Sequence, residues 1–246
     1  MSIRRCSSSC ITGARLNPPP AMLLWQRILE AIAAAGNSVI AYLAGKAAVP
    51  EHSVAFTVGL IGLSAKMAKA DGVVTAEEIE AFRKILIIPP EELKHVARVF
   101  NLAKQDVAGF EAYARQLAQL FKTKPEILED VLDGLFHIAK SDRFVHEREL
   151  AFLNAVAGIF GFNDSAFKRI LARHIASPGS NAYEVLGVER NASSEAIRAA
   201  WLKLVREHHP DRHIAAGMPE EAIKIATGRL AHINAAYDVI ARERGL

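Results

Sequence analysis

Apolar residues recur at three- and four-residue spacing through most of the chain, which is the period of an α-helix with one buried face. Between residues 54 and 175 the pattern marks seven segments: 54–70, 76–87, 91–104, 108–121, 125–140, 147–160 and 165–175. Turn signals such as Asp71-Gly72 separate them. The sequence has no strand-like alternation of comparable extent, so the pattern predicts an all-α fold.

The first fifty residues divide into two parts. Residues 22–50 carry a helical pattern, but Arg27 and Glu30 interrupt it. A membrane span needs about 20 consecutive apolar residues, so we expect an amphipathic helix on its own domain or on a membrane surface. Residues 1–21 lack the apolar core of a signal peptide. We expect them to be a disordered extension upstream of a start at Met22, with a transit peptide as the alternative.

Charge and cysteine content narrow the function classes. The net charge of +3 comes from Arg4, Arg5 and Arg15, and the rest of the chain is balanced. Nucleic-acid binding usually needs a basic face, so we expect no nucleic-acid partner. The two cysteines, Cys6 and Cys10, leave the body without thiols. This suits a reducing cytoplasm or the inner face of its membrane.

Two segments of the predicted bundle are similar to each other. Residues 67–79 and 138–150 align without gaps, and each places a Glu seven positions after an Asp. If a divalent metal binds, the two copies would supply it together, with candidate ligands Asp71, Glu78, Asp142 and Glu149. The earlier ligand positions of a calcium loop hold Met and Lys, so an EF-hand is not predicted.

Helix capping explains the same residues without a metal, and we favour it. Thr75 and Glu78 form the pattern of a capping box, in which each side chain accepts a hydrogen bond from a backbone amide of the other residue. In the second copy His146 stands at the Thr75 position, so we expect weaker capping there. His146 is also a less favoured ligand candidate.

Residues 52–176, with the Ala-Lys-x-Ala-Lys-Ala-Asp-Gly motif that ends at Gly72 and its second copy, resemble the TerB family. That resemblance implies an all-α pseudo-repeat whose acidic residues are proposed to bind metal. It also implies an interaction or sensing module and no known reaction. The motifs of a nucleophile elbow or a phosphate-binding glycine loop are missing from the chain, so we expect no enzyme.

Residues 182–246 have a different pattern. After Tyr183-Glu-Val-Leu-Gly, Ser193 is a plausible N-cap of an amphipathic helix. His209-Pro210-Asp211 follows that helix, and a second amphipathic helix ends the segment. The spacing predicts two antiparallel helices joined by the His-Pro-Asp loop. Their facing residues are predicted to be Ile197, Trp201, Leu204, Val205 and His208 with Leu230, Ile233, Ala236 and Tyr237.

The His-Pro-Asp loop has the chemistry of a recognition element. Pro210 fixes its own φ and biases His209 away from helix. Asp211 offers acceptors to a cation of a partner, and His209 offers two ring nitrogens. A stiff loop loses little entropy on binding. Without a surrounding pattern, we would expect His208, His209 and His213 to be solvated loop residues.

The full order of motifs resembles the J-domain of the DnaJ family. The resemblance implies binding to a DnaK-type heat-shock chaperone and stimulation of its ATP hydrolysis. His209, Pro210 and Asp211 would contact the chaperone, and Arg198, Lys203 and Arg206 would provide a basic docking face. Leu202 and Glu207 depart from the usual basic residues, so we expect weaker electrostatic steering.

Residues 22–246 together resemble the bacterial DjlA family, with residues 177–181 as a short linker. That likeness predicts a co-chaperone whose TerB-like part directs the recruited chaperone to a client that the sequence does not name. The alternative is a metal-binding scaffold or stress-sensing module that acts through the TerB-like part.

Overall fold

The computed structural model describes residues 28–30, 32–33, 38–43, 52–71, 76–86, 88, 90–106, 108–142, 145–175 and 181–246. The predicted extension 1–21 lies outside these residues, as do most of the predicted helix 22–50 and nearly all of the linker 177–181. Within the described residues all regular secondary structure is helical, which confirms the all-α prediction.

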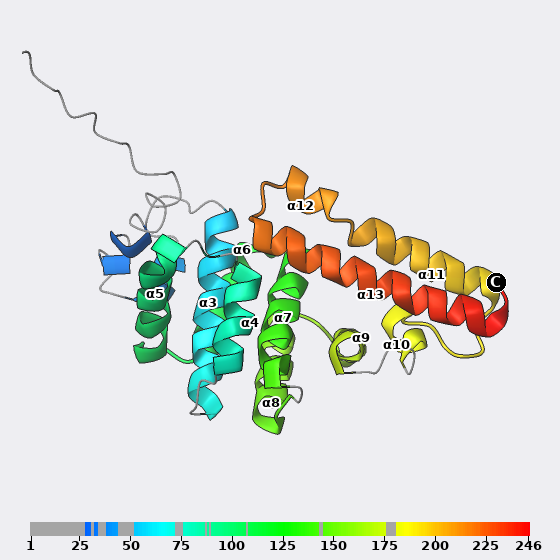
Figure 1. Ribbon diagram of the computed structural model, residues 1–246, viewed down its shortest axis with the longest axis horizontal. Coiled ribbons are helices and arrows are strands. Elements are labelled where there is room, and N and C mark those ends of the chain that lie inside the picture. The colour runs from blue at the N-terminus through cyan, green and yellow to red at the C-terminus, as the bar shows by residue number, and fades with distance from the viewer. Residues whose placement is uncertain are drawn as a thin grey trace, which may run out of the picture.

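The helices follow the predicted order (Figure 1). In the amino-terminal part they are α2 (Val39–Leu43), α3 (His52–Asp71), α4 (Ala76–Leu86), η1 (Pro90–Glu92), α5 (Leu93–Gln105), α6 (Phe110–Leu120), α7 (Pro125–Ala139), η2 (Lys140–Asp142), α8 (Glu147–Ile159) and α9 (Asp164–Ile175). In the carboxyl-terminal part they are α10 (Ala182–Leu186), α11 (Ser194–Glu207), α12 (Asp211–Ala215) and α13 (Glu220–Arg244). The seven predicted segments correspond to α3 through α9, and the sequence did not predict α12.

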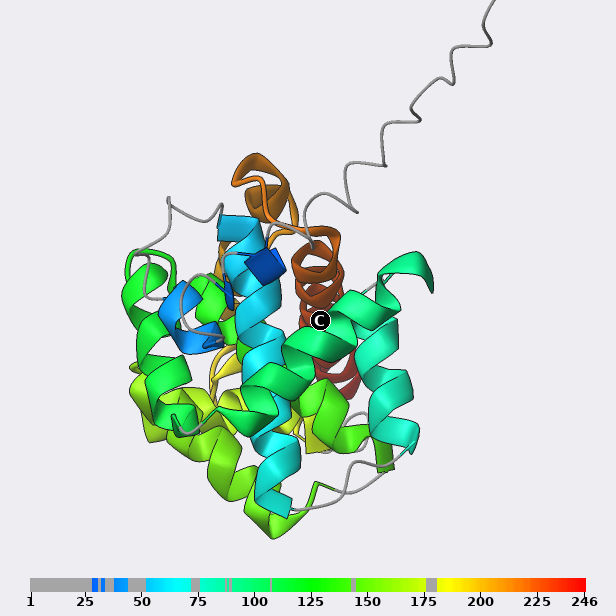
Figure 2. The ribbon, with the colours of Figure 1, turned by 90° about the vertical axis from the view of Figure 1, so that its left-hand side faces the viewer.

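Helix α3 is the centre of the amino-terminal bundle (Figure 2). Every residue from Val54 to Ala68 is buried, because α3 carries apolar or small residues on all sides, as a central core helix does. Ile28, Ile32, Val39 and Leu43 are buried in the same core. None of the helices within the described residues has the length and apolar character that a bilayer crossing requires.

The carboxyl-terminal part is a helical hairpin of α11 and α13, with α10 at its base (Figure 1). Its own core holds Ile197, Leu204 and Ile233. The rings of Trp201 and Tyr237 stack at 4.3 Å, and the Trp201 indole donates a hydrogen bond of 2.9 Å to Asn234. The predicted facing stripes are therefore confirmed except at Leu230, which is half-buried and lies outside this core. His208 is buried and contacts Arg229 of α13.

Helix α13 belongs to both parts of the molecule. Its carboxyl-terminal half packs on α10 and α11, whereas Ala222 and Ile225 near its start, with Met218 just before it, join the large core of the amino-terminal bundle. Gly134 of α7 allows this close approach, because a Cβ there would lie 3.2 Å from Ile225 Cδ1. Thr57 of α3 also donates a hydrogen bond to Glu221 of α13. The hairpin is therefore docked on the bundle.

Candidate functional site

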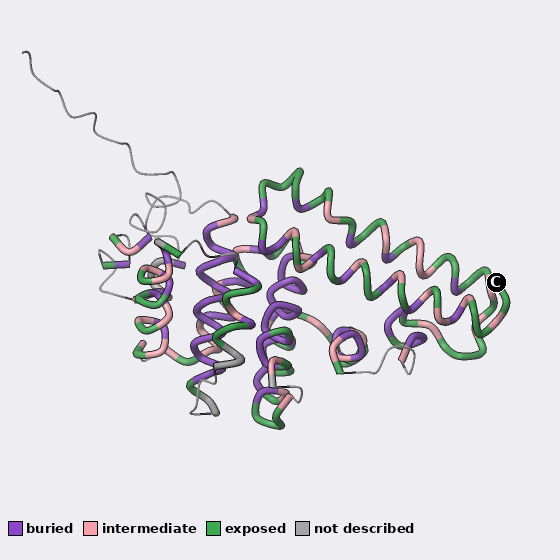
Figure 3. Tube along the Cα trace, viewed as in Figure 1, coloured by how far each residue is buried: buried purple, intermediate pink, exposed green. Residues whose placement is uncertain are grey.

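The His-Pro-Asp corner lies where α11 ends and α12 begins. Pro210 is the N-cap of α12, with φ −57° and ψ −27°, and its carbonyl accepts the His213 amide at 2.9 Å. The short helix thus starts directly from the proline, whose fixed φ suits a helix start. Figure 3 shows this turn on the outside of the molecule, and the side chains of His209 and Asp211 are 47% and 80% exposed.

The side chain of His209 contacts Asp211, two positions further along the chain. The backbone N–H of Asp211 donates to His209 Nδ1 at 3.3 Å. The Asp211 carboxylate also lies close to this ring, with Oδ2 3.4 Å from Nδ1. The corner thus presents an imidazole and an exposed carboxylate side by side.

The three predicted cations of α11 are exposed. At 100° per residue, Arg198, Lys203 and Arg206 fall within roughly 140° of the helix circumference, away from the buried Ile197 and Leu204. Lys203 lies 3.9 Å from Glu207 with both side chains largely exposed, a separation at which an exposed ion pair contributes little. The structure therefore brings the six predicted partner-binding residues to one helix and the turn that follows it.

The two histidines that flank the corner are buried, so the alternative interpretation as solvated loop residues is wrong for both. His208 and His213 are 7% and 2% exposed. His208 Nδ1 lies 3.1 Å from Nη1 of Arg229, and because a guanidinium only donates, His208 is the acceptor. His213 Nε2 contacts the carboxylate of Asp130 on α7. Both histidines therefore hold the ends of the corner to neighbouring helices, His208 to α13 and His213 to α7.

Arg229 of α13 is the centre of a buried charge cluster, which we call the α7–α13 cluster. Its Nε donates to Asp133 Oδ2 at 2.7 Å, and its Nη2 lies 2.6 Å from Asp130 Oδ1 as an ion pair. From α9, Arg173 donates to Glu129 at 2.6 Å. The cluster consists of Glu129, Asp130, Asp133, Arg173, His174, His208, His213 and Arg229.

Burial and charge act in opposite directions on the acids of the cluster. Burial alone would raise the pKa of Asp133, but Arg173, Arg229 and His174 hold that pKa well below its usual value. Burial raises the pKa of Asp130, with Arg229 and His213 opposing the rise. Buried carboxylates are tolerated only when they are paired in this way.

His208 is neutral because of its surroundings. Burial is the main reason that its pKa is lowered to about 4. The charge of Glu129 opposes this shift, and the charge of Arg229 adds to it. This agrees with its role as an acceptor from the guanidinium. The residue just before the corner is therefore an uncharged ligand of Arg229 near neutral pH.

Of the four predicted metal ligands, the structure describes the side chain of Glu149 alone. The side chains of Asp71, Glu78 and Asp142 lie outside the described residues, so their metal binding stays a prediction. Glu149 is buried and accepts the His146 amide at 2.8 Å, as part of a capping box at the start of α8. The side chains of the first capping box, Thr75 and Glu78, lie outside the described residues, so the expectation of weaker capping in the second copy stays a prediction. Among the described side chains, no group of three or more histidines, cysteines or acids is arranged to hold a metal.

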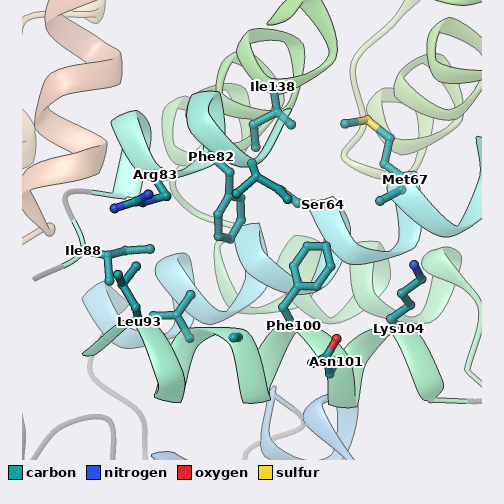
Figure 4. Close-up of a pocket in the computed structure, with 14 residues that line it drawn as sticks. Ser64, Met67, Phe82, Arg83, Ile88, Leu93, Phe100, Asn101, Lys104 and Ile138 are labelled. Carbon is teal, nitrogen blue, oxygen red and sulfur yellow. The ribbon is translucent and has the colours of Figure 1, made fainter. Parts of the chain in front are cut away.

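An apolar pocket of about 360 Å³ lies between α3, α4 and α5 (Figure 4). Met67, Phe82, Leu93 and Phe100 are among its lining residues, and Arg83 and Lys104 also line it. Met67 belongs to the first copy of the repeat. No residue of the J-domain hairpin lines this pocket.

Two family models match the chain. Tellurite resistance protein TerB covers residues 57–172, and the DnaJ domain covers residues 181–244. The chain is a DjlA-like co-chaperone. It is 29% identical over 205 residues to Co-chaperone protein DjlA of Photobacterium profundum, across 73% of this chain and 74% of the relative.

A second relative covers more of the chain. Co-chaperone protein DjlA of Aliivibrio fischeri is 26% identical over 243 residues, which are 85% of this chain and 86% of that protein. These relatives bear the name of a co-chaperone and not of an enzyme. No solved structure matches the chain.

Sequence reasoning missed the α7–α13 cluster, although one signal was present. Glu129, Asp130 and Asp133 stand in a helix that is otherwise strongly apolar. At 100° per residue these three acids fall within one sector of about 100° on α7, and burial of such an acidic sector requires cationic partners. The sequence alone did not indicate that one of these partners, Arg229, would come from the J-domain.

Proposed function

We propose that this protein recruits a DnaK-type heat-shock chaperone through its J-domain and stimulates the chaperone's ATP hydrolysis. The observation that carries the proposal is the exposed His209–Pro210–Asp211 corner. The proline holds the loop stiff, the exposed Asp211 carboxylate can reach a cation of the partner, and the half-exposed His209 ring lies beside it. A stiff, exposed and polar corner of this kind binds a partner with little loss of conformational entropy.

The cations of α11 support the same proposal. Arg198, Lys203 and Arg206 form an exposed positive strip that leads to the corner. Such a strip accelerates encounter with an acidic surface and orients the corner for contact. Ile214 of α12 is 58% exposed and adds an apolar contact beside Asp211.

We further propose that the TerB-like part selects the client on which the recruited chaperone acts. The pocket between α3, α4 and α5 supports this role, because its apolar lining suits an apolar side chain of a client. The J-domain leaves that pocket uncovered, so the two partners can be bound together.

The test is the steady-state ATP turnover of a DnaK-type chaperone at increasing concentrations of this protein. We expect the wild type to stimulate turnover. Loss of a hydrogen bond to a charged group costs about 1.5–3 kcal/mol, so Asp211→Asn should weaken stimulation about ten-fold or more. Asp238→Asn is the matched control, since Asp238 is an exposed residue of α13 away from the corner.

Two results would overturn the proposal. One is an unchanged chaperone turnover at saturating wild-type protein. The other is equal stimulation by wild type, Asp211→Asn and His209→Gln, because the corner would then not be the contact.

A further inference from the structure

The residues on both sides of the corner are tied to the TerB-like part. His208 precedes the corner and accepts from Arg229, which is itself paired with α7. Beyond the corner, Arg212 lies 3.7 Å from Glu126 of α7, and His213 contacts Asp130 one turn further along α7. The chain is therefore held immediately before and immediately after the three residues that the partner would touch.

Helix α7 is a firm support for these contacts. Val131, Leu132, Leu135 and Phe136 are fully buried in the large core, so the helix cannot shift without opening that core. Its acids lie at helical spacing, with Glu126 and Asp130 one turn apart. These acids on one face of α7 thus contact both α12 and α13.

Arg229 connects the two parts electrostatically. Its side chain is 0% exposed and faces Asp130 and Asp133. Separation of the J-domain from α7 would break these ion pairs and would also remove Ala222 and Ile225 of α13 from the large core. The docked arrangement is therefore strongly favoured over a freely swinging J-domain.

Docking leaves the partner-binding residues free. His209 and Asp211 are exposed in the docked arrangement, and Arg198, Lys203 and Arg206 point to solvent from α11. The contact therefore does not cover the corner. It fixes the corner's position relative to the TerB-like part.

We propose that Arg229 and Asp130 are positioning residues, through which the TerB-like part holds the His-Pro-Asp corner in the conformation that the chaperone binds. This inference rests on the proposed function. The corner is ordered before the encounter, so the chaperone does not have to order it. The TerB-like part then contributes to chaperone activation as well as to client choice.

The first test compares wild type, Arg229→Met and the matched control Arg242→Met, an exposed arginine of the same helix. Helix content by circular dichroism checks that each variant is folded. We expect Arg229→Met to need about ten-fold more protein for half-maximal stimulation of chaperone turnover. The maximal stimulation should stay within about two-fold of wild type, because the contact residues are intact. Arg242→Met should behave as wild type.

Covalent rescue separates positioning from a general loss of structure. Lys224 of α13 donates to the Lys84 carbonyl of α4 at 2.6 Å, so Lys84→Cys and Lys224→Cys can be joined by a short bis-maleimide linker, with Cys6 and Cys10 replaced by serine. Cross-linking should restore the half-maximal concentration of Arg229→Met to near the wild-type value. If cross-linked Arg229→Met stays defective while fully helical, the proposal is overturned.

A measurement on the protein alone completes the test. Amide hydrogen exchange of residues 209–216 should be about ten-fold faster in Arg229→Met than in wild type, while α11 keeps its protection. If Arg229→Met does not fold, Asp130→Asn is used, because it retains the shape of the side chain and leaves two carboxylates for two arginines.

The outcomes are distinct for the two proposals. Wild-type protein that leaves chaperone turnover unchanged contradicts the proposed function. Wild-type protein that stimulates turnover, together with a folded Arg229→Met or Asp130→Asn that matches it at every concentration and in exchange, contradicts the positioning role alone.

Discussion

Three histidines within six residues have different environments. His209 is exposed at the corner, whereas His208 accepts from Arg229 and His213 contacts Asp130. The residue type is the same, so the difference comes from where each side chain points as α11 ends and α12 begins. Only His209 is left available to a partner.

The environment of His208 predicts a pH dependence of stability. The pKa of His208 falls from 6.5 in a free chain to about 4 in the folded protein. Between these values the unfolded chain binds more protons, so stability is complete above pH 6.5 and is lost as the pH falls toward 4. From these values we expect the contribution of His208 to the unfolding free energy to drop by about 2 kcal/mol between pH 7 and pH 5.

Denaturant unfolding of wild type and His208→Gln at both pH values measures this contribution. Glutamine keeps an oxygen acceptor for Arg229 but does not titrate. The loss of unfolding free energy from pH 7 to pH 5 should therefore be smaller in His208→Gln by about 2 kcal/mol. Identical losses in the two proteins would contradict the neutral, buried state of His208.

At the scale of elements, α13 determines the arrangement. Its 25 residues are enough to span the hairpin and still reach the bundle, where Ala222 and Ile225 enter the large core. The same helix carries Arg229 between these two regions. One helix, α13, therefore forms an arm of the J-domain hairpin and also part of the TerB-like core.

The exposed strip of α11 leads to a prediction about encounter. Arg198→Glu/Arg206→Glu should raise the concentration for half-maximal chaperone stimulation by about ten-fold at low salt, with less effect at high salt, because exposed charges act at long range and are screened. Lys94→Glu/Arg98→Glu on α5 is the control, with the same change in net charge at exposed positions. Equal effects of the two double variants would indicate that overall charge, and not the α11 strip, is responsible.

Most helices were predictable because each needs only its own periodicity. Ser193 was predicted as an N-cap and accepts the Ala196 amide at 3.2 Å, since capping depends on neighbouring residues alone. Helix α12 was missed because five residues are too few to show a period. The exposed corner followed from the stiffness of Pro210 and its polar neighbours.

At the scale of the whole molecule, the docking of the two parts was not predictable. It depends on contacts between residues about a hundred positions apart, such as Arg229 with Asp130 and Asp133. A buried arginine in an amphipathic helix has the same local pattern as an exposed one. The composition of residues 176–181 permitted independent motion, and only the three-dimensional structure places α13 in the large core.

In the docked arrangement, the proposed chaperone site and the proposed client site lie on different parts of one molecule. The corner faces outward from one end of the α13 hairpin, and the apolar pocket opens between α3, α4 and α5. A chaperone on the corner and a client on the pocket would be held by one continuous structure. The TerB-like part and the J-domain would therefore act as a single unit.

The most direct measurement is a single turnover of ATP. A DnaK-type chaperone already loaded with ATP is mixed with an excess of the wild-type protein, and the release of phosphate is followed over time. We predict that hydrolysis becomes about ten-fold faster or more, equivalent to a barrier lowered by at least about 1.4 kcal/mol. A hydrolysis rate equal to that of the chaperone alone, at concentrations where the two proteins form a complex, would contradict this prediction.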